Sequence, residues 1–380
     1  MKPLRLDDYE DLAREYLAAD VFDYYAGGAC DEHTLRDNRE AFTRLRLVGR
    51  VLRDVAERSL ATRVLGSDIS MPVMIAPVAF QRLAFDDGEL ATARAAAEAD
   101  TLMIISTLSS VSIEEVAAAT HGPLWFQLYV YKDRGLTLEL VRRAEDAGYR
   151  ALVLTVDAQV WGKRERDLRH CFELPSGVTM ANLEGAVHGR FPSERSAPAP
   201  SAAGHGVSGS GLAATHRSMS GSGLAAHVDS LFDAALDWNT VAWLIGQTRL
   251  PVVLKGVLHP DDARLAMAHG AAGVFVSNHG GRQLDTAPAT LDALEGVVEA
   301  VGGRGEVYLD GGVRRGSDVA KALALGARAV AIGRPVVWGL AAAGARGVSG
   351  VLEILRDELD VALALCGARR PDELDRAVLL

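Results

Sequence analysis

Residues 273–285 read GVFVSNHGGRQLD, an apolar run followed at once by polar residues and glycines. A short, continuously apolar run is typical of a parallel strand that is buried on both faces. The polar residues after it would then lie at the carboxyl end of the strand, where α/β folds place their functional groups. The same pattern recurs along the chain and decides the fold class.

Eight such runs alternate with stretches of helical periodicity. The runs are Val73–Pro77, Leu102–Ser106, Trp125–Tyr129, Ala151–Asp157, Pro251–Gly256, Gly273–Asn278, Glu306–Gly312 and Ala329–Arg334. Apolar residues at i, i+3 and i+4 predict helices over 88–100, 112–120, 136–148, 261–270 and 316–326. Repeated strand–helix alternation predicts a (β/α)8 TIM barrel, with a doubly wound open sheet as the alternative.

The chain has 380 residues, which suits one large domain over residues 1–380. We expect an N-terminal segment over 1–70 and a barrel over 71–365. Residues 176–236 interrupt the alternation with a Ser/Gly-rich stretch in which SGSGLAA occurs at 208–214 and again at 220–226. Such a composition buries little apolar surface. It is interpreted either as a spacer or as a lid over the barrel mouth.

Composition narrows the class of partner and the compartment. The net charge of −10 argues against nucleic acid, which needs a basic surface. We expect no membrane span, because no run of 18 apolar residues occurs. Residues 1–17 indicate an amphipathic helix and not a signal peptide. Three distant cysteines, Cys30, Cys171 and Cys366, favour a reducing, cytoplasmic location and argue against a disulfide framework or a metal site.

The residues at the predicted strand ends form a ring of polar and small groups. In chain order they are Pro77, Val78 and Ala79, then Ser106, Gln127, Tyr129, Thr155, Asp157, Lys255, Ser277, Asn278, His279, Asp310, Gly311, Gly312, Gly333 and Arg334. Burying so many polar groups without partners is costly. The ring therefore predicts a ligand site at one mouth of the barrel.

The last two strand ends indicate a phosphate site. Gly311, Gly312 and Arg314 follow the seventh strand, and Gly333 and Arg334 follow the eighth. Barrels bind phosphate at this position with backbone N–H groups at a helix start. Glycine allows close backbone approach, and arginine adds charge-assisted hydrogen bonds.

Candidate catalytic groups come from several strands. His279 can accept a proton near neutral pH, and Asp157 could orient the imidazole. Arg282 and Arg164 could clamp a carboxylate, although KRERDLR (163–169) equally fits a solvated charge run. The phenols of Tyr24 and Tyr129 could bind a substrate or simply belong to the core. Lys255 ends a buried strand, so its charge needs a partner, and a cofactor anion would serve.

At this point the motifs identify a family. The sequence resembles the FMN-dependent 2-hydroxy acid oxidases and dehydrogenases, which include glycolate, lactate and hydroxymandelate oxidases and mandelate dehydrogenase. The resemblance runs from Asp7 to about Leu365. Its pieces are FDYYAGGA (22–29), MPVMIAPVA (71–79), FQLYVYKDR (126–134), LTVD with GKRERDLR, LPVVLKGV (250–257), GVFVSNHGGRQLD, VYLDGGVRRGSDVAKALALGA (307–327) and AIGRPVVWGLAAAG (331–344).

The resemblance implies a cofactor, FMN, across the barrel mouth, and a role for each candidate. Flavin-ring contacts would come from Pro77, Val78, Ala79, Ser106, Gln127 and Thr155. Lys255 would stabilise negative charge on the reduced ring, and Ser277 would also bind the cofactor. Asp310, Gly311, Gly312, Arg314, Gly333 and Arg334 would hold the ribityl phosphate. His279, oriented by Asp157, would take the hydroxyl or α-proton of a 2-hydroxy acid. Arg164 and Arg282 would bind its carboxylate, and Tyr24 and Tyr129 would polarise its hydroxyl.

Two departures from the resemblance bear on the substrate. Glycolate oxidases carry Trp where this chain has Leu108, which widens the pocket and favours aryl or bulky acids such as mandelate or 4-hydroxymandelate. Trp161 replaces a smaller residue and could refill that space or stack on a substrate ring. We expect an oxidase that reduces O2 to H2O2. The alternatives are a dehydrogenase that uses a quinone or another carrier, and an oxidatively decarboxylating monooxygenase. Relatives often form homotetramers.

Overall fold

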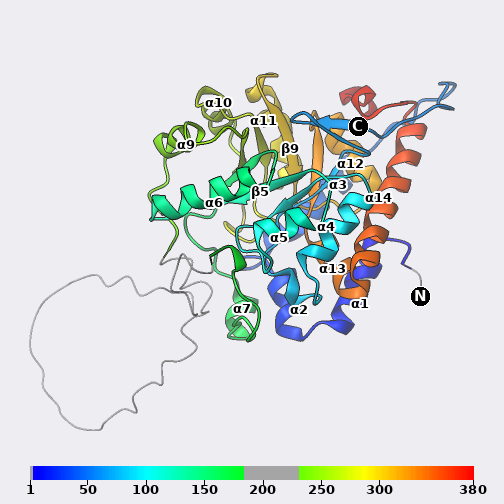
Figure 1. The fold of residues 1–380 in the computed structure, drawn as a ribbon. Coiled ribbons are helices and arrows are strands. Elements are labelled where there is room, and N and C mark those ends of the chain that lie inside the picture. Colours follow the sequence, from blue (N-terminus) through cyan, green and yellow to red (C-terminus); the bar gives the residue numbers. More distant parts are fainter. Residues whose placement is uncertain (1–2, 184–230) are drawn as a thin grey trace, which may run out of the picture.

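The computed structural model describes residues 3–183 and 231–380, which form a closed barrel of eight parallel strands (Figure 1). In barrel order the strands are β3 (Val73–Ile75), β4 (Met103–Ile105), β5 (Leu124–Leu128), β6 (Leu152–Thr155), β7 (Val252–Val257), β8 (Gly273–Val276), β9 (Glu306–Asp310) and β10 (Ala329–Ile332). β10 pairs with β3 and closes the barrel. The predicted TIM barrel is confirmed, and the alternative prediction of a doubly wound open sheet is wrong.

Helices follow the strands and surround them. They are α4 (Glu89–Glu98), α5 (Ile113–Ala118), α6 (Arg134–Asp146), α7 (Glu165–Arg169), α9 (Trp238–Ile245), α10 (Pro260–Ala268), α11 (Thr290–Val301), α12 (Gly316–Ala324), α13 (Arg334–Ala343) and α14 (Ala345–Leu365). All five helices predicted from periodicity are present. Short 3-10 turns lie at η1 (Gln81–Leu83), η2 (Ala181–Leu183), η3 (Pro371–Glu373) and η4 (Arg376–Val378).

Three helices precede the barrel: α1 (Leu6–Tyr16), α2 (Ala19–Ala26) and α3 (His33–Arg44). The N-terminal helix predicted within residues 1–17 is therefore confirmed. α1 packs against α13 and α14, so the first helix of the chain lies beside the last two helices (Figure 1). A small antiparallel hairpin, β1 (Thr62–Val64) and β2 (Ser67–Ile69), follows these helices. The sequence patterns did not indicate this hairpin, because each strand has only three residues.

Each barrel strand presents alternate residues to two separate cores. One set faces the helices, whereas the other fills the barrel and meets the hairpin. Trp125 of β5 and Tyr308 of β9 lie four strands apart in barrel order, yet their rings meet edge to face at 5.5 Å. This contact crosses the barrel interior. The barrel is thus a packed core and not a pore, and its chemistry must lie at a mouth.

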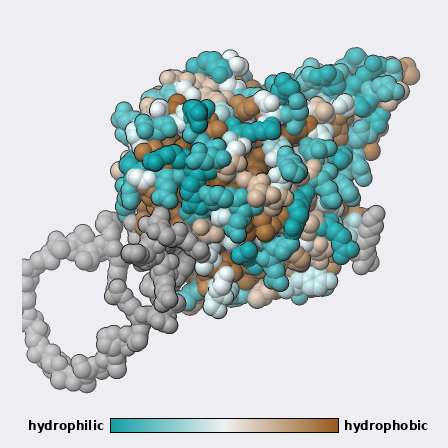
Figure 2. All heavy atoms as spheres, in the orientation of Figure 1, coloured by the Kyte–Doolittle hydropathy of each residue, from teal (hydrophilic) through white to brown (hydrophobic). Residues whose placement is uncertain are grey.

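Hydrophilic side chains cover much of the outer helices on the face seen in Figure 2, with smaller hydrophobic areas between them. Among the described residues, no helix combines the length and the apolar character that a membrane crossing requires. Most of the loop expected over 176–236 lies outside the described residues, so the lid and spacer interpretations both stay predictions. At its carboxyl flank, Phe232 forms a β-bridge with Tyr131 beyond β5.

Candidate active site

A cavity of about 1040 Å³, counting its open mouth, lies at the carboxyl ends of the strands. Its size suits a small molecule or cofactor. All of the predicted site residues line it except Asn278, Asp157 and Ser277. Asp157 holds His279 and Ser277 holds Lys255. The structure therefore brings the predicted residues together from segments between Tyr24 and Arg334.

His279 and Asp157 form a hydrogen-bonded pair. The imidazole Nδ1 lies 2.9 Å from the carboxylate Oδ1 of Asp157. His279 adopts a positive φ of 57°, and Gly280 and Gly281 continue in the same left-handed region, which is rare for a residue with a side chain. At Gly280 an added Cβ would lie 2.8 Å from Nη1 of Arg334. The glycine is needed there both for its φ and for close packing.

The pair has a defined charge state near neutral pH. Burial lowers the pKa of His279, and Lys255 lowers it further, against the opposing effect of Asp157. Burial alone would raise the pKa of Asp157, but His279 and Lys255 together hold it below its usual value. A neutral imidazole therefore faces an ionised carboxylate. The carboxylate fixes the proton on Nδ1 and leaves Nε2 free to accept another.

Lys255 finds its partner inside the protein. Its Nζ lies 3.1 Å from Oδ2 of Asp310 and donates to Oγ of Ser277 at 2.9 Å. Although burial alone would lower the pKa of Lys255, Asp310 and Asp157 raise it above its usual value. The lysine is thus a fixed cation at the cavity wall. The sequence predicted the need for a partner but did not indicate Asp310 as that partner.

Arg164 is buried, unlike Lys163 and Arg169 in the same run of charged residues. Lys163 and Arg169 make exposed ion pairs with Glu165, whereas Arg164 is only 4% exposed. Its guanidinium lies 3.8 Å above the ring of Trp161, and its hydrogen bonds to Arg282 O and Gln283 Oε1 are long, at 3.4 and 3.5 Å. Burial, and then Arg282, lower the pKa of Arg164 to about 9. One face of the Trp161 indole is therefore already taken by Arg164.

Arg282 and Arg334 bind backbone carbonyls at the carboxyl end of α2. Nη1 of Arg282 donates to the carbonyls of Tyr24 and Gly27 at 2.7 and 3.0 Å. Arg334 donates to the carbonyls of Tyr25, Gly27 and Gly280 through its three nitrogens. These bonds attach the N-terminal segment to the barrel mouth and bring Tyr24 into the cavity lining.

Four arginines gather at the cavity without carboxylate partners. Among residues 3–183 and 231–380, no acidic group lies within ion-pair distance of Arg164, Arg282, Arg314 or Arg334. Nε of Arg314 is buried with no partner in this part of the chain, and burial and Arg39 lower the pKa of Arg314 to about 10. Buried, mutually repelling cations require anions. A phosphate and a carboxylate would supply them.

The rest of the cavity lining suits a planar heterocycle. Val78 and Ala79 give it an apolar wall beside Pro77. Nε2 of Gln127 donates to Oγ1 of Thr155 at 2.9 Å, and Oε1 of Gln127 accepts from Oγ of Ser106 at 3.3 Å. An apolar wall, a polar edge, a fixed lysine and a cationic end are the groups that a flavin mononucleotide requires. The residues present therefore fit FMN.

Tyr24 and Tyr129 both line the cavity, and each is stacked on a phenylalanine. Tyr24 lies 4.5 Å from the ring of Phe172, and Tyr129 lies 4.4 Å from the ring of Phe232. Burial raises the pKa of both phenols, so each keeps its proton and can donate a hydrogen bond.

Several residues that support the site were not singled out from the sequence. Nε2 of Gln283 donates to the carbonyls of Asp157 and Val160, and Asp285 accepts from the backbone of Asp31 and Thr34. Gln283 and Asp285 both lie within GVFVSNHGGRQLD, so the motif itself was the available signal. Asn38, which exchanges two hydrogen bonds with Asn278, carried no such signal.

Comparison with known proteins agrees with this chemistry. The family model for FMN-dependent dehydrogenases matches residues 13–380. The chain is 49% identical to an L-lactate oxidase from Nostoc sp. over 99% of its length and 98% of the relative, and 48% identical to glycolate oxidase from Spinacia oleracea over 99% and 95%. A solved structure of mandelate oxidase with (S)-4-hydroxymandelic acid is 43% identical, with a TM-score of 0.88 over 100% of this chain and 98% of that one.

The fold and the cavity thus define a flavin-dependent oxidoreductase on a TIM barrel. The chain belongs to the FMN-dependent dehydrogenase family. It is an FMN-dependent enzyme that oxidises 2-hydroxy acids, as its oxidase relatives indicate.

Proposed function

We propose that the enzyme oxidises an (S)-2-hydroxy acid to the 2-oxo acid and passes the electrons to O2, which yields H2O2. The observation that carries this proposal is the juxtaposition of a base and a carboxylate clamp. The neutral His279, paired with Asp157 at 2.9 Å, lines the same cavity as Arg164 and Arg282. A 2-hydroxy acid offers both a carboxylate for the clamp and, on the adjacent carbon, a proton and a hydroxyl for the base.

We assign the steps on the protein as follows. Arg164 and Arg282 bind the carboxylate, and Tyr24 and Tyr129 donate to or orient the hydroxyl. His279 takes one of the two protons that the oxidation releases, and Asp157 stabilises the imidazolium that forms. When bound, FMN supplies the two-electron acceptor. Lys255, Ser106, Gln127 and Thr155 would orient the ring, and Arg314, Arg334 and the turn glycines would hold the phosphate.

We infer that the acid is aryl or bulky, such as mandelate or 4-hydroxymandelate. Leu108 lines the cavity and is nearly buried, and it leaves more room than a tryptophan at this position. Trp161 does not refill that space freely, because Arg164 occupies one of its faces. The mandelate oxidase structures, 41–43% identical to this chain, support the same inference.

The acceptor is tested by product analysis in air. We expect one H2O2 and one 2-oxo acid for each hydroxy acid consumed. Consumption without O2 uptake, in the presence of a quinone, would instead identify the dehydrogenase alternative. A decarboxylated acid as the main product, with little free H2O2, would identify the monooxygenase alternative.

We also propose that residues 1–380 form a single domain, that the enzyme is cytoplasmic, and that it forms a homotetramer. The tetramer is measured by light scattering of the purified enzyme, where a monomeric mass would contradict it.

A further inference from the structure

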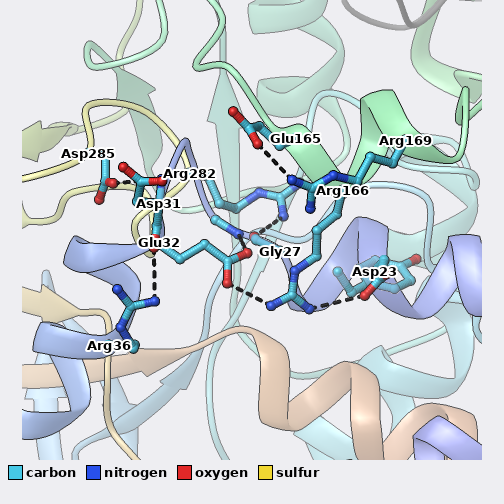
Figure 3. A network of polar contacts seen from close by, with 12 residues as sticks. Asp23, Gly27, Asp31, Glu32, Arg36, Glu165, Arg166, Arg169, Arg282 and Asp285 are labelled. Atoms are coloured by element: carbon cyan, nitrogen blue, oxygen red, sulfur yellow. Dashed lines mark hydrogen bonds and ion pairs between the residues drawn. The ribbon is translucent and has the colours of Figure 1, made fainter.

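An ion-pair bridge joins two short helices beside the cavity (Figure 3). Arg166 of α7 donates from Nη1 to Oδ1 of Asp23 in α2 at 3.0 Å and from Nη2 to Oε2 of Glu32 at 2.6 Å. The other oxygen of Glu32 accepts from the backbone N–H of Gly28 at 2.9 Å. One guanidinium thus fastens α7 to α2 and to Glu32, which precedes α3. His170, at the end of α7, adds a second contact, with its Nε2 2.8 Å from Oδ2 of Asp23.

Each end of this bridge adjoins a proposed substrate contact. Asp23 directly precedes Tyr24, and Arg166 lies two residues after Arg164. Arg282 also donates to the carbonyls of Tyr24 and Gly27, at the carboxyl end of α2. A change in the separation of α2 and α7 would therefore move the phenol of Tyr24 relative to the guanidinium of Arg164.

The bridge is more enclosed than the other ion pairs of α7. The side chains of Arg166, Asp23 and Glu32 are 33%, 26% and 16% exposed, whereas Arg169, which pairs with Glu165, is 73% exposed. The stem of Arg166 also packs on the turn, since an added Cβ at Gly27 would lie 3.3 Å from its Cδ. Partly buried pairs are screened less by water and salt than exposed ones.

Neither helix is long enough to hold its own position. α7 has five residues and α2 has eight, and helices of that length are unstable without tertiary contacts. The bridge is a tertiary contact that ties one to the other. Arg166 itself does not line the cavity that Tyr24 and Arg164 line, so an effect of the bridge on the site would pass through the positions of α2 and α7.

We propose that Arg166 is a positioning residue that sets the separation between Tyr24 and Arg164 by clamping α7 onto α2. The inference rests on the proposed substrate contacts of Tyr24 and Arg164. Loss of the clamp should weaken carboxylate binding while leaving the His279–Asp157 pair and the FMN site intact.

The test compares Arg166→Met, Arg166→Lys and the control Arg169→Met as holoenzymes. Oxalate, a small dicarboxylate that cannot be oxidised as a hydroxy acid, serves as the probe through its perturbation of the flavin absorbance. We expect Arg166→Met to raise the Kd of oxalate and the substrate KM about 10-fold, the order that two partly buried ion pairs can supply. Flavin content and the flavin reduction rate at saturating substrate should change less than about 3-fold.

Arg166→Lys should recover part of the loss, because one ammonium can keep one of the two carboxylates. Arg169→Met should bind oxalate as the wild type does. If Arg166→Met fails to fold, the isosteric variant Glu32→Gln is measured instead and judged by the same criterion, because Asp23 also pairs with His170. An unchanged oxalate Kd and KM in the folded variant would overturn the proposal.

An Arg164→Met variant separates this proposal from the proposed site. If Arg164→Met weakens oxalate binding and Arg166→Met does not, the positioning role is wrong and the carboxylate clamp stands. If neither variant changes oxalate binding, the clamp itself is wrong, and the positioning role falls with it.

Discussion

The imidazole Nδ1 of His279 lies 2.9 Å from Oδ1 of Asp157, although 122 residues separate them in the chain. Asp157 follows β6 and His279 follows β8, with β7 between these strands. The barrel brings the two side chains together because parallel strands have their carboxyl ends at the same rim. Burial and Lys255 keep the histidine neutral, so it is ready to accept a proton.

His279→Gln tests the base directly. Glutamine keeps a polar side chain of similar size but cannot take a proton near neutral pH. We expect normal FMN content and a flavin reduction rate at least about 100-fold lower, the lower range for loss of a general base. Stopped-flow absorbance without oxygen measures this rate. A rate near that of the wild type would remove His279 from the role of base.

Asp157→Asn should change the pH profile in a defined direction. The carboxylate raises the pKa of His279, while burial and Lys255 lower it. In the wild type, the pKa of His279 already lies below the ordinary value of about 6.5 for histidine. Without the carboxylate this pKa should fall further, so the acid limb of the kcat/KM profile should move to lower pH. The plateau should fall at least about 10-fold, because one pKa unit of imidazolium stabilisation is worth a factor of 10. An acid limb that moves to higher pH would contradict the assignment.

Trp161→Leu should weaken carboxylate binding through Arg164. The indole face lies 3.8 Å from the guanidinium, and such a contact contributes about 0.5–2 kcal/mol. We therefore expect the oxalate Kd to rise about 2- to 30-fold, with the FMN content unchanged. An unchanged Kd would mean that the stacking does not hold Arg164 in its binding position.

Arg314→Met should reduce the affinity of the apoprotein for FMN. Arg314 has a free donor for an anion, because its Nε is buried without a partner among the described residues. A hydrogen bond to a charged group contributes about 1.5–3 kcal/mol, so the Kd of FMN should rise about 10- to 100-fold. Fluorescence quenching of added FMN measures the Kd. The neighbouring Arg315→Met, which loses only an exposed pair with Glu358, is the matched control and should bind FMN normally.

Leu108→Trp should change substrate choice by filling the pocket. We expect kcat/KM for mandelate, relative to that for glycolate, to fall at least about 10-fold, because steric exclusion from a lined pocket discriminates by this order. A ratio that stays constant would show that Leu108 does not bound the space for the substrate side chain.

The barrel was predictable because its signal is repeated. Each strand is a continuous apolar run, and a single misjudged element would not hide the alternation. The positions of strand ends then follow from the closed topology, which explains why most of the predicted site residues line one cavity. The hairpin β1–β2 was not predictable, because two three-residue strands have too short a pattern.

Individual contacts were less predictable than the site. KRERDLR has the composition of a solvated surface, and nothing in it tells which arginine is buried. Only the tertiary structure stacks the guanidinium of Arg164 on the ring of Trp161 and leaves Arg169 exposed. Likewise, Lys255 clearly needed a partner, but its pairing with Asp310 depends on β7 and β9 facing each other across β8 at the mouth.

The most direct measurement is anaerobic bleaching of the bound flavin, followed by admission of air. The yellow holoenzyme is mixed with glycolate, lactate, (S)-mandelate and (S)-4-hydroxymandelate in turn. We expect the aryl acids to bleach the flavin fastest, and air to restore the colour quickly with release of H2O2. Failure of all four acids to bleach the flavin would contradict the proposed 2-hydroxy acid oxidase with this site.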